Sequence, residues 1–190
     1  MKKKILLLMG SGHRGGNTDH LSDAFRKGAE AAGHTVTKVY LGELSIGGCR
    51  GCNACRYGKP CVLRDDMQKI YPLYDECDVV VLASPLYFWT LCSSIKAFIE
   101  RLYAVAEEDL TPPMGRYERY APKESVLLMT AADDLFWTFS QAEPYYRFLA
   151  EYLGWTNRGA VLAGGCGGVS GPRGVPEICE KEAYRLGYEL

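Results

Sequence analysis

Short apolar runs alternate with amphipathic stretches along the chain. The first run, Lys4 to Met9, is apolar at every position after its lysine and ends at a glycine, which is typical of a buried parallel strand. Further aliphatic or β-branched runs predict strands at residues 35–40, 78–83, 125–130 and 159–163. Amphipathic spacing predicts helices over residues 17–32, 65–74, 92–106, 141–153 and 176–188. The proline-containing stretch between the third helix and the fourth strand predicts a loop at residues 107–122.

Strands that alternate with helices imply a parallel sheet covered on both faces, because the crossovers between parallel strands are right-handed. Five strands in this alternation favour the flavodoxin-like order 2-1-3-4-5. We therefore expect an α/β three-layer sandwich. No internal repeat or linker divides the sequence, which predicts one domain over residues 1–190 with an irregular, cysteine-rich loop at residues 47–64.

A glycine-rich loop follows the first strand, and Gly10, Gly12 and Gly15 match the dinucleotide pattern G-x-G-x-x-G. In a dinucleotide fold the helix would begin near the second glycine. Glycines would then lie in the first turns of the helix, where each costs about 1 kcal/mol relative to alanine. A helix that begins at Asn17 or Thr18 avoids this cost and gains a good N-cap. The pattern therefore favours a longer loop than dinucleotide folds use.

The acidic residue that dinucleotide loops need about 20 residues further on is also missing, because the second strand ends in a tyrosine and Glu43 lies beyond it. We therefore predict that residues 10–16 bind one terminal phosphate through backbone N–H groups and the helix N-terminus. Side chains of Ser11, Asn17 and Thr18 would contribute. A glycine-rich turn that binds no ligand is the alternative.

A proline and three consecutive aromatic residues follow the third strand, within residues 84–89. A loop at the carboxyl end of a parallel strand is where α/β sheets bind ligands. Three aromatic residues in a row cannot all be buried on one element, so some should face a flat ligand or a partner subunit. The alternative is that these aromatic side chains pack in the core and at a dimer interface. The loop at residues 130–134 should flank the ligand from the other side, where Phe136 and Trp137 either cover it or pack in the core.

Four cysteines lie close together in the sequence with the spacing C-x₂-C-x₂-C-x₅-C: Cys49, Cys52, Cys55 and Cys61. Such a run can wrap one compact cluster, whereas structural zinc sites more often use two C-x₂-C pairs about a dozen or more residues apart. Nearby glycines permit sharp turns, and nearby basic residues offset the charge of a thiolate-ligated cluster. The spacing favours a [4Fe–4S] cluster first, zinc second, and free or oxidisable thiols third.

The other cysteines are isolated. Cys77, Cys92 and Cys179 are expected to be buried as small hydrophobic residues. Cys166 lies inside a run of glycines that could leave it exposed, and we assign it no role.

The composition of the chain argues against several classes of function. Hydrophobic residues make up 47% of the chain and charged residues 24%, as in ordinary globular proteins. A formal net charge of −1 gives no broad basic field for nucleic acid or an anionic membrane. The apolar runs are too short for a signal peptide or a membrane span. We therefore expect a cytoplasmic protein, in which eight cysteines indicate metal or redox chemistry rather than disulfides.

These motifs resemble those of one known family. Residues 10–18 resemble the phosphate loop of the NADPH-dependent FMN reductase group of flavodoxin-like proteins, and residues 84–89 resemble its flavin-ring loop. The cysteine spacing, followed by Asp-Asp-Met at residues 65–67, is similar to that of the iron–sulfur flavoprotein branch. The specific resemblance runs from residue 4 to about residue 101. His13 stands where family members often carry proline, which leaves its role open.

The resemblance implies FMN as the cofactor and a [4Fe–4S] cluster on the four clustered cysteines. The implied FMN-binding residues lie in three loops: Ser11, His13, Gly16, Asn17, Thr18, Pro85, Leu86, Tyr87, Phe88, Trp89, Thr130 and Ala131. The sequence shows no acid–base constellation, and none is needed where a flavin carries the chemistry.

Two functions are compatible with these features. The first is an FMN-dependent oxidoreductase that takes a hydride from NAD(P)H and passes electrons to a quinone, a flavin or a one-electron carrier, through the cluster where one is bound. The second is a non-catalytic redox- or zinc-sensing module on a flavodoxin-like scaffold. The excess of aromatic residues near the third strand, together with the resemblance, predicts a homodimer or homotetramer.

Overall fold

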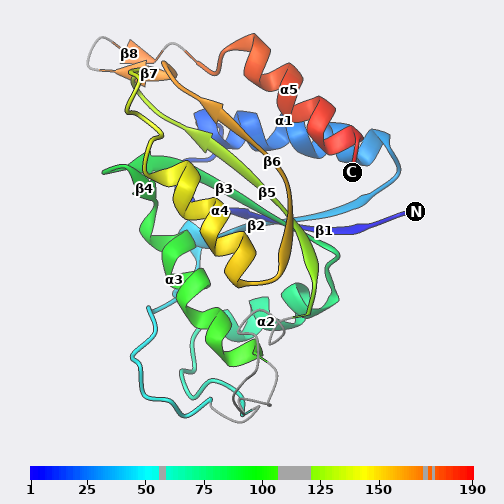
Figure 1. Cartoon of the computed structure of the whole chain (residues 1–190), viewed down its shortest axis with the longest axis vertical. Helices are drawn as coiled ribbons and strands as arrows, with labels where there is room; N and C mark the ends of the chain where they lie inside the picture. Colours follow the sequence, from blue (N-terminus) through cyan, green and yellow to red (C-terminus); the bar gives the residue numbers. More distant parts are fainter. Residues whose placement is uncertain (56–58, 107–120, 169–170, 173) are drawn as a thin grey trace.

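A parallel sheet lies at the centre of the computed structural model, which describes residues 1–55, 59–106, 121–168, 171–172 and 174–190. Its five parallel strands are β1 (Lys4–Met9), β2 (Thr35–Tyr40), β3 (Val79–Tyr87), β5 (Lys123–Thr130) and β6 (Trp155–Ala163). Their order is β2-β1-β3-β5-β6 (Figure 1), which confirms the predicted order of the parallel strands. Most of the loop predicted at residues 107–122 lies outside the described residues.

Helices cover both faces of the sheet, as predicted for a three-layer sandwich (Figure 1). One layer consists of α1 (Asn17–Ala31) and α5 (Glu177–Tyr188). The other consists of α2 (Met67–Glu76), α3 (Ser93–Arg101) and α4 (Ala142–Tyr152). Two 3₁₀ turns, η1 (Leu41–Glu43) and η2 (Leu102–Val105), follow β2 and α3, and a small hairpin joins β7 (Gly167–Gly168) to β8 (Gly171–Pro172). No helix in the described part of the chain is long and apolar enough to cross a membrane.

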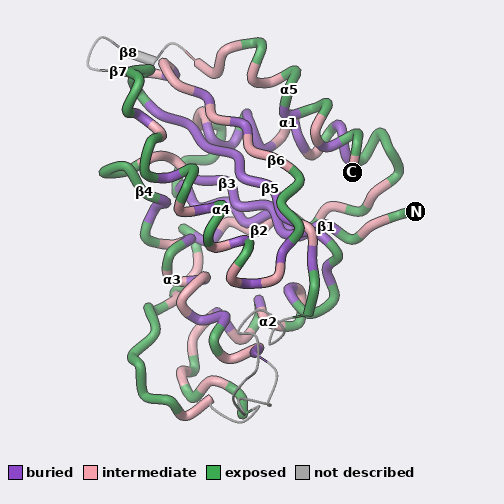
Figure 2. The backbone as a smooth tube through the Cα atoms, in the orientation of Figure 1, coloured by how far each residue is buried: buried purple, intermediate pink, exposed green. Residues whose placement is uncertain are grey.

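The alternation of side chains along β1 divides the core between the two layers. Ile5, Leu7 and Met9 pack with the α1 and α5 layer, while Leu6 and Leu8 pack with the other. All five are fully buried, consistent with the continuous buried trace of the central strands in Figure 2. A strand buried on both faces needs apolar residues at consecutive positions, so the run has no polar alternation.

The third strand is longer than its apolar run predicts. It continues through Ser84 and Pro85, which pair with β5, to Tyr87. The chain then turns at Phe88 and Trp89 and returns as β4 (Thr90–Leu91), antiparallel to β3. Residues 84–89, predicted as a loop, are therefore a strand end and a two-residue turn, because neighbouring backbone supplies pairing partners that the sequence pattern does not show.

Other element boundaries differ from the predictions by a few residues. The strands predicted at residues 125–130 and 159–163 begin earlier, at Lys123 and Trp155, where they pair with each other. The helix predicted over residues 92–106 is α-helical only to Arg101 and then becomes the 3₁₀ turn η2.

Glycines allow α1 and α5 to approach each other closely. A Cβ atom on Gly28 would lie 2.0 Å from the carbonyl oxygen of Tyr184, and one on Gly187 would lie 2.2 Å from that of Phe25. Both distances are far below van der Waals contact. Glycine inside a helix normally costs about 1 kcal/mol relative to alanine, and here the close helix packing requires it.

Candidate functional site at the carboxyl edge of the sheet

Helix α1 begins at Asn17 without a side-chain cap. The N-cap is Gly16, whose backbone is extended and which has no side chain to bond the helix. The predicted start of the helix is confirmed, but the expectation that Asn17 or Thr18 would cap it is wrong, because both lie inside the helix and their side chains bond other loops. The first N–H groups of a helix have no intrahelical acceptor. An anion is a suitable partner for such groups.

The glycine-rich loop is fixed against β3 and the start of α3. The N–H of Gly10 donates to the carbonyl of Ala83 at 2.8 Å, and the Ser94 hydroxyl donates to the carbonyl of Gly10 at 2.9 Å. A Cβ on Gly10 would lie 2.4 Å from Cys92 Sγ, so only glycine fits there. Gly15 has a φ of +69°, a conformation that glycine adopts without strain. The loop is thus held in one shape.

Asn17 and Thr18 connect the start of α1 to the end of β5 and to the loop after β6. The hydroxyls of Thr18 and Thr130 form a buried hydrogen bond of 2.6 Å, which links α1 to the end of β5. Asn17 Nδ2 donates to the carbonyl of Cys166 at 3.0 Å, beyond the end of β6. Cys166 itself is buried, not exposed as its glycine-rich surroundings suggested.

The other predicted residues of this loop are placed around the same helix start. Ser11 is buried, and its hydroxyl accepts a hydrogen bond of 3.1 Å from the N–H of His13. Gly16 is half-buried and His13 is exposed.

The turn between β3 and β4 projects aromatic side chains outward. Phe88 and Trp89 have φ angles of +48° and +61°. Two positive φ values in a two-residue hairpin turn correspond to a type I′ turn, where asparagine and glycine are the favoured residues. The left-handed conformation costs roughly 1–2 kcal/mol per residue that carries a Cβ. Phe88 is nevertheless 91% exposed, so packing of this ring in the core of the chain does not offset that cost.

A second aromatic pair lies on the loop after β5. Phe136 and Trp137 contact each other edge to face with ring centroids 4.5 Å apart. Phe136 is 92% exposed, which excludes the expectation that it packs in the core. A cavity of about 210 Å³ lies between this loop and the β3–β4 turn, lined by Leu86, Phe88, Trp89, Ala131, Ala132, Asp133 and Thr138. The structure therefore brings the two predicted loops together around one space.

A larger cavity, of about 680 Å³, borders the glycine-rich loop. Its walls come from that loop, from the turn after β2, from α3 as far as Glu100 and from Gly48 of the cysteine-rich loop; they also include Tyr87. Tyr87 reaches this cavity while Phe88 and Trp89 line the smaller one. The strand end and turn at residues 87–89 thus separate two cavities.

The cysteine-rich loop leaves β2 and runs along α3 toward the C-terminal end of that helix (Figure 1). Cys49 and Cys52 are exposed, and Cys55 and Cys61 are half-buried. Burial raises the pKa of the Cys55 thiol, and the charges of the other three cysteines raise it further. In the described part of the chain, no three cysteine, histidine or carboxylate side chains converge closely enough to hold a metal ion.

The burial of the isolated cysteines agrees with the prediction for two of the three residues expected to be buried. Cys77 and Cys92 are buried as expected, whereas Cys179 is only half-buried.

The sequence matches the family model of the NADPH-dependent FMN reductases over residues 3–130, two thirds of the chain. The chain belongs to the NADPH-dependent FMN reductase family. An iron–sulfur flavoprotein of Archaeoglobus fulgidus is 37% identical over 99 residues, which cover 52% of this chain and 45% of the relative. The chain spans about half the length of the curated iron–sulfur flavoproteins that it matches.

Solved structures of similar fold include the NAD(P)H:quinone oxidoreductase of Methanothermobacter marburgensis, with a TM-score of 0.76 at 16% identity and complete coverage of both chains. A second is RosB, solved with bound 8-demethyl-8-formylriboflavin-5′-phosphate. It has a TM-score of 0.71 at 18% identity, covering 98% of this chain and 76% of RosB. At these identities the similarity establishes the flavodoxin-like fold of this family member.

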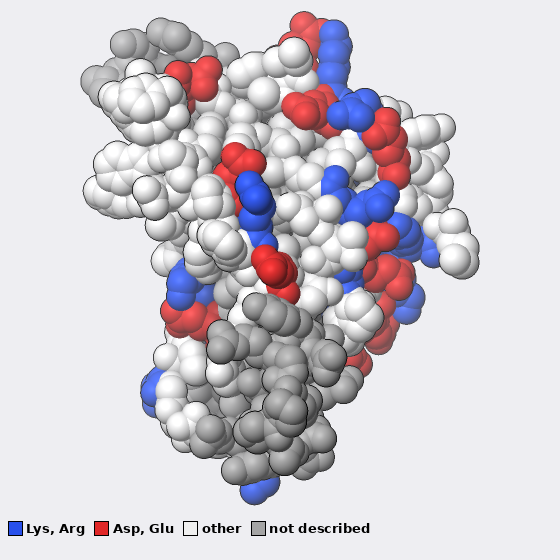
Figure 3. Space-filling model, viewed as in Figure 1, with Lys and Arg blue, Asp and Glu red and all other residues white. Residues whose placement is uncertain are grey.

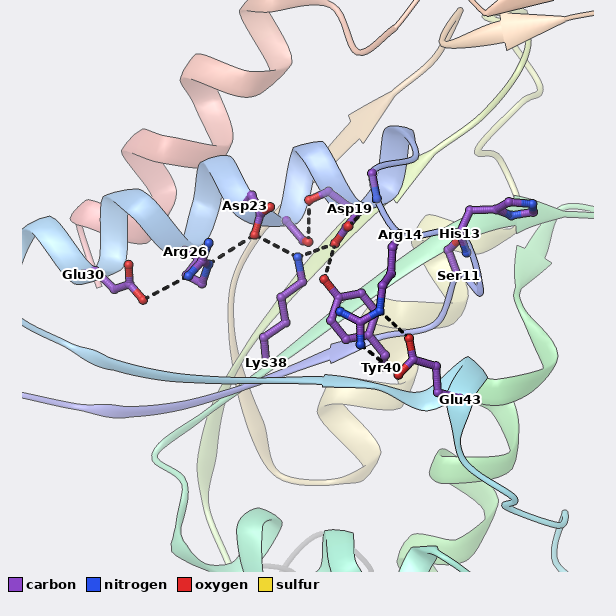
Figure 4. Close-up of polar contacts among 12 residues, drawn as sticks. Ser11, His13, Arg14, Asp19, Asp23, Arg26, Glu30, Lys38, Tyr40 and Glu43 are labelled. Atoms are coloured by element: carbon purple, nitrogen blue, oxygen red, sulfur yellow. Dashed lines mark hydrogen bonds and ion pairs between the residues drawn. The ribbon is translucent and has the colours of Figure 1, made fainter.

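Sequence reasoning missed a network of charged residues beneath the glycine-rich loop (Figure 4). One Asp19 carboxylate oxygen accepts a 2.7 Å hydrogen bond from the N–H of Gly15, and the other accepts bonds from Lys38 and from the Tyr40 hydroxyl. Burial opposes ionisation of Asp19, but the bonds from Lys38, Gly15 and Tyr40 outweigh it, so the pKa of this carboxyl lies below its ordinary value. Asp19 therefore stays charged and holds the loop. An acidic residue in the first turn of a helix is the signal that could have indicated it.

Arg14 and Glu43 form a second part of this network (Figure 4). Arg14 forms a two-point ion pair with Glu43, and its guanidinium lies 3.9 Å from the centroid of the Tyr40 ring. Glu43, beyond the end of β2, is thus engaged with the loop of its own chain. On the face shown in Figure 3, basic and acidic side chains are intermixed without a broad field of one sign.

Proposed function

We propose that this member of the FMN reductase family binds FMN at the carboxyl edge of its sheet and acts as an NAD(P)H-dependent oxidoreductase. The observation that carries the proposal is the juxtaposition of an uncapped helix start after β1 with an outward-facing aromatic turn after β3, its neighbour in the sheet. The uncapped helix start suits a phosphate group, and the aromatic turn suits a flat aromatic ring. The flavin phosphate bound to RosB, a protein of the same fold, supports this assignment.

The phosphate of FMN would bind to the N–H groups at the start of α1 and to Ser11, Asn17 and Thr18. The glycine-rich loop fits this group because it is preshaped and presents N–H groups without a side-chain cap. The bond between the Thr18 and Thr130 hydroxyls uses one of their two protons, so the other can be donated to a phosphate oxygen. His13 and Gly16 would lie beside the phosphate.

The flavin ring would lie between the two aromatic loops. We assign its contacts to Pro85, Leu86, Tyr87, Phe88 and Trp89 on one side, and to Thr130 and Ala131 on the other. Aromatic side chains here exclude water from one edge of the ring and fix its plane. FMN supplies the redox chemistry, by accepting a hydride from NAD(P)H and delivering electrons to an acceptor. The chain binds and orients the cofactor, so it needs no catalytic acid or base.

We propose further that Cys49, Cys52, Cys55 and Cys61 hold a [4Fe–4S] cluster that delivers single electrons to a carrier. The spacing and the names of the matched iron–sulfur flavoproteins support this assignment. Zinc is the second candidate ligand. Without a cluster, the acceptor would be a quinone, a free flavin or another small molecule.

The exposed rings of the aromatic loops lead us to propose that a second copy of the chain covers part of this edge. Apolar patches of this kind mark interaction sites. The predicted state is a homodimer or homotetramer, and light scattering at micromolar concentration would test it.

The visible spectrum of protein purified without oxygen tests the proposed function. We expect the two absorption bands of oxidised flavin, with a broad brown shoulder that dithionite bleaches where a cluster is present. NADH or NADPH should bleach the flavin bands. A colourless protein that contains stoichiometric zinc and does not retain added FMN would instead support a metal- or thiol-sensing module.

Replacing Asn17 and Thr18 together by alanine should weaken FMN binding by a few kcal/mol. Hydrogen bonds to charged groups contribute about 1.5–3 kcal/mol each, and the double change also removes the contacts that join the loops after β1, β5 and β6. Quenching of FMN fluorescence gives the affinity. Thr156→Ala, an exposed position at the opposite edge of the sheet, is the matched control. Unchanged FMN affinity in the double variant would contradict the phosphate assignment.

A further inference from the structure

The two ends of the cysteine-rich loop are joined at a neck. The neck consists of Ser45 and Gly47, where the chain enters the loop, and Asp65 and Asp66, where it leaves. Asp66 accepts a 2.8 Å hydrogen bond from the N–H of Ser45 and donates its own N–H to the Ser45 carbonyl at 3.0 Å. Asp65 accepts a 3.1 Å bond from the N–H of Gly47. The neck therefore closes the loop before any ligand is considered.

A buried arginine from another element contacts both sides of the neck. Arg101, at the C-terminal end of α3, is only 2% exposed. Its Nη1 donates to the Gly47 carbonyl at 3.0 Å and to the Asp65 carboxylate at 2.6 Å, and its Nη2 donates to the other Asp65 oxygen at 3.1 Å. The planar guanidinium is suited to such a two-point pair, which lysine cannot reproduce.

The helix end also reaches the first cysteine. Glu100, the residue before Arg101, accepts a 3.1 Å hydrogen bond from the N–H of Cys49. A Cβ on Gly48 would lie 2.9 Å from the same Glu100 carboxylate, so the backbone approaches the helix closely at this point. Consecutive residues of α3 thus fix the loop at its neck and at its first cysteine.

Charge at the neck is maintained in spite of burial. Burial opposes the charged form of Arg101, but its bonds to Asp65 and the nearby Tyr71 and Cys61 raise its pKa above the ordinary value. Arg101 Nε is buried and has no acceptor among the described residues. An ion pair with a buried arginine is often no more stabilising than apolar residues of the same volume, so it is weak evidence for a role in stability. The bonds of Arg101 to both sides of the neck place it to hold the loop.

We propose that Arg101 is a positioning residue that keeps the cysteine-rich loop closed and so presets the four thiols for a metal. The inference rests on the metal site proposed above. Four ligands on a flexible loop must lose conformational freedom when they bind a metal, and a neck that is already closed removes part of that cost. The negative charge of a thiolate-ligated metal would also lie near a buried cation that has an unused N–H donor.

Three variants and a control test this role. Arg101→Gln removes the cation, Asp65→Asn removes the carboxylate with almost no change in size, and Arg101→Lys keeps the charge without the two-point geometry. Arg185→Gln is the control, because Arg185 is an exposed arginine on α5 that pairs with Glu189. The measurements are hydrogen exchange of the backbone amides between residues 45 and 66, and an anaerobic titration of metal-free protein with Co²⁺, followed by thiolate-to-cobalt absorption.

We expect faster exchange in residues 45–49 of Arg101→Gln and Asp65→Asn, with unchanged exchange in β1 and β3. Their Co²⁺ affinity should fall by roughly 10- to 100-fold, as for other residues that orient metal ligands. Arg101→Lys should lie between these variants and the wild type. Normal exchange at the neck in folded Asp65→Asn would overturn the proposal, and so would faster exchange with unchanged Co²⁺ affinity. Where Arg101→Gln does not fold, Asp65→Asn decides.

The two proposals can fail separately. Wild-type protein that binds no Co²⁺ through its cysteines would remove the proposed metal site, and with it the presetting of thiols for a metal. Exchange at the neck would still show whether Arg101 holds the loop closed. Wild-type protein that binds Co²⁺, together with variants that bind it equally well, would instead leave the metal site intact and exclude the role of Arg101.

Discussion

Replacing Phe88 by asparagine and Trp89 by glycine should make the protein more stable and its FMN binding weaker. Both residues have positive φ angles in a two-residue turn, for which Asn-Gly is the preferred sequence. Removing the strain of two left-handed residues should raise the free energy of unfolding by about 1–3 kcal/mol. Urea unfolding of the flavin-free protein measures this gain.

The same change should reduce FMN affinity by roughly 10- to 100-fold. Phe88 and Trp89 line the smaller cavity at this edge, and aromatic contacts contribute about 0.5–1.5 kcal/mol each beyond the area they bury. Tenfold in affinity corresponds to about 1.4 kcal/mol. Opposite effects on stability and binding are expected where backbone strain is retained for function.

A control separates this effect from the general loss of an exposed ring. Phe148 is 71% exposed on α4, away from the two aromatic loops. Replacing it by asparagine should leave the FMN affinity unchanged. The free energy of unfolding should change by no more than a few tenths of a kcal/mol. The turn variant would contradict the hypothesis if it lost stability, or if it kept the wild-type affinity for FMN.

The order of the sheet could be predicted from the sequence because apolar or β-branched runs alternate with helix patterns. The unbroken apolar runs of β1 and β3 indicate burial on both faces, and the handedness of crossovers then limits the topology. The start of α1 at Asn17 was predictable for a similar reason, since glycine is costly inside a helix. These predictions depend on local properties of the chain.

The turn at Phe88 and Trp89 could not be predicted in this way. Neither residue favours a positive φ, so the sequence lacks the Asn-Gly signal of a type I′ turn, and only the pairing of Leu86 with Leu91 reveals the hairpin. The roles of Asp19 and Arg101 also depend on contacts between segments far apart in the sequence. Polar networks of this kind arise from the tertiary fold, because their partners are not related by any sequence period.

Spacing indicated that the four cysteines could bind a metal, but not where the loop would lie. Gly48 of the cysteine-rich loop lines the same cavity as Ser11 and Gly12 of the glycine-rich loop. Glu100 and Arg101, in the last turn of α3, hold the cysteine-rich loop at Cys49 and Gly47. A helix of nine residues spans about 13 Å, so one helix length separates the start of α3 from the point where the loop is attached.

Replacing Cys52 by serine should slow electron delivery to one-electron carriers while leaving FMN bound. A serine hydroxyl is a poor substitute for a thiolate, so the iron content and the brown absorption of the anaerobic protein should fall close to zero. The phosphate and ring loops are separate segments of the chain and should be unaffected. Reduction of the flavin by NAD(P)H should therefore keep its wild-type rate.

Stopped-flow measurements under nitrogen can follow these two steps separately. Loss of flavin absorbance reports hydride transfer from NAD(P)H, and the colour change of a one-electron acceptor reports delivery, with a quinone as the two-electron comparison. Cys179→Ser, at an isolated and half-buried cysteine, is the matched control and should preserve both rates and the iron content. The proposed relay would reach the flavin either within one chain or in a neighbouring subunit. In either case the relay requires the metal. A Cys52→Ser protein that loses its iron yet reduces one-electron acceptors at the wild-type rate would therefore exclude the relay. The cysteines would then have a structural, storage or sensing role.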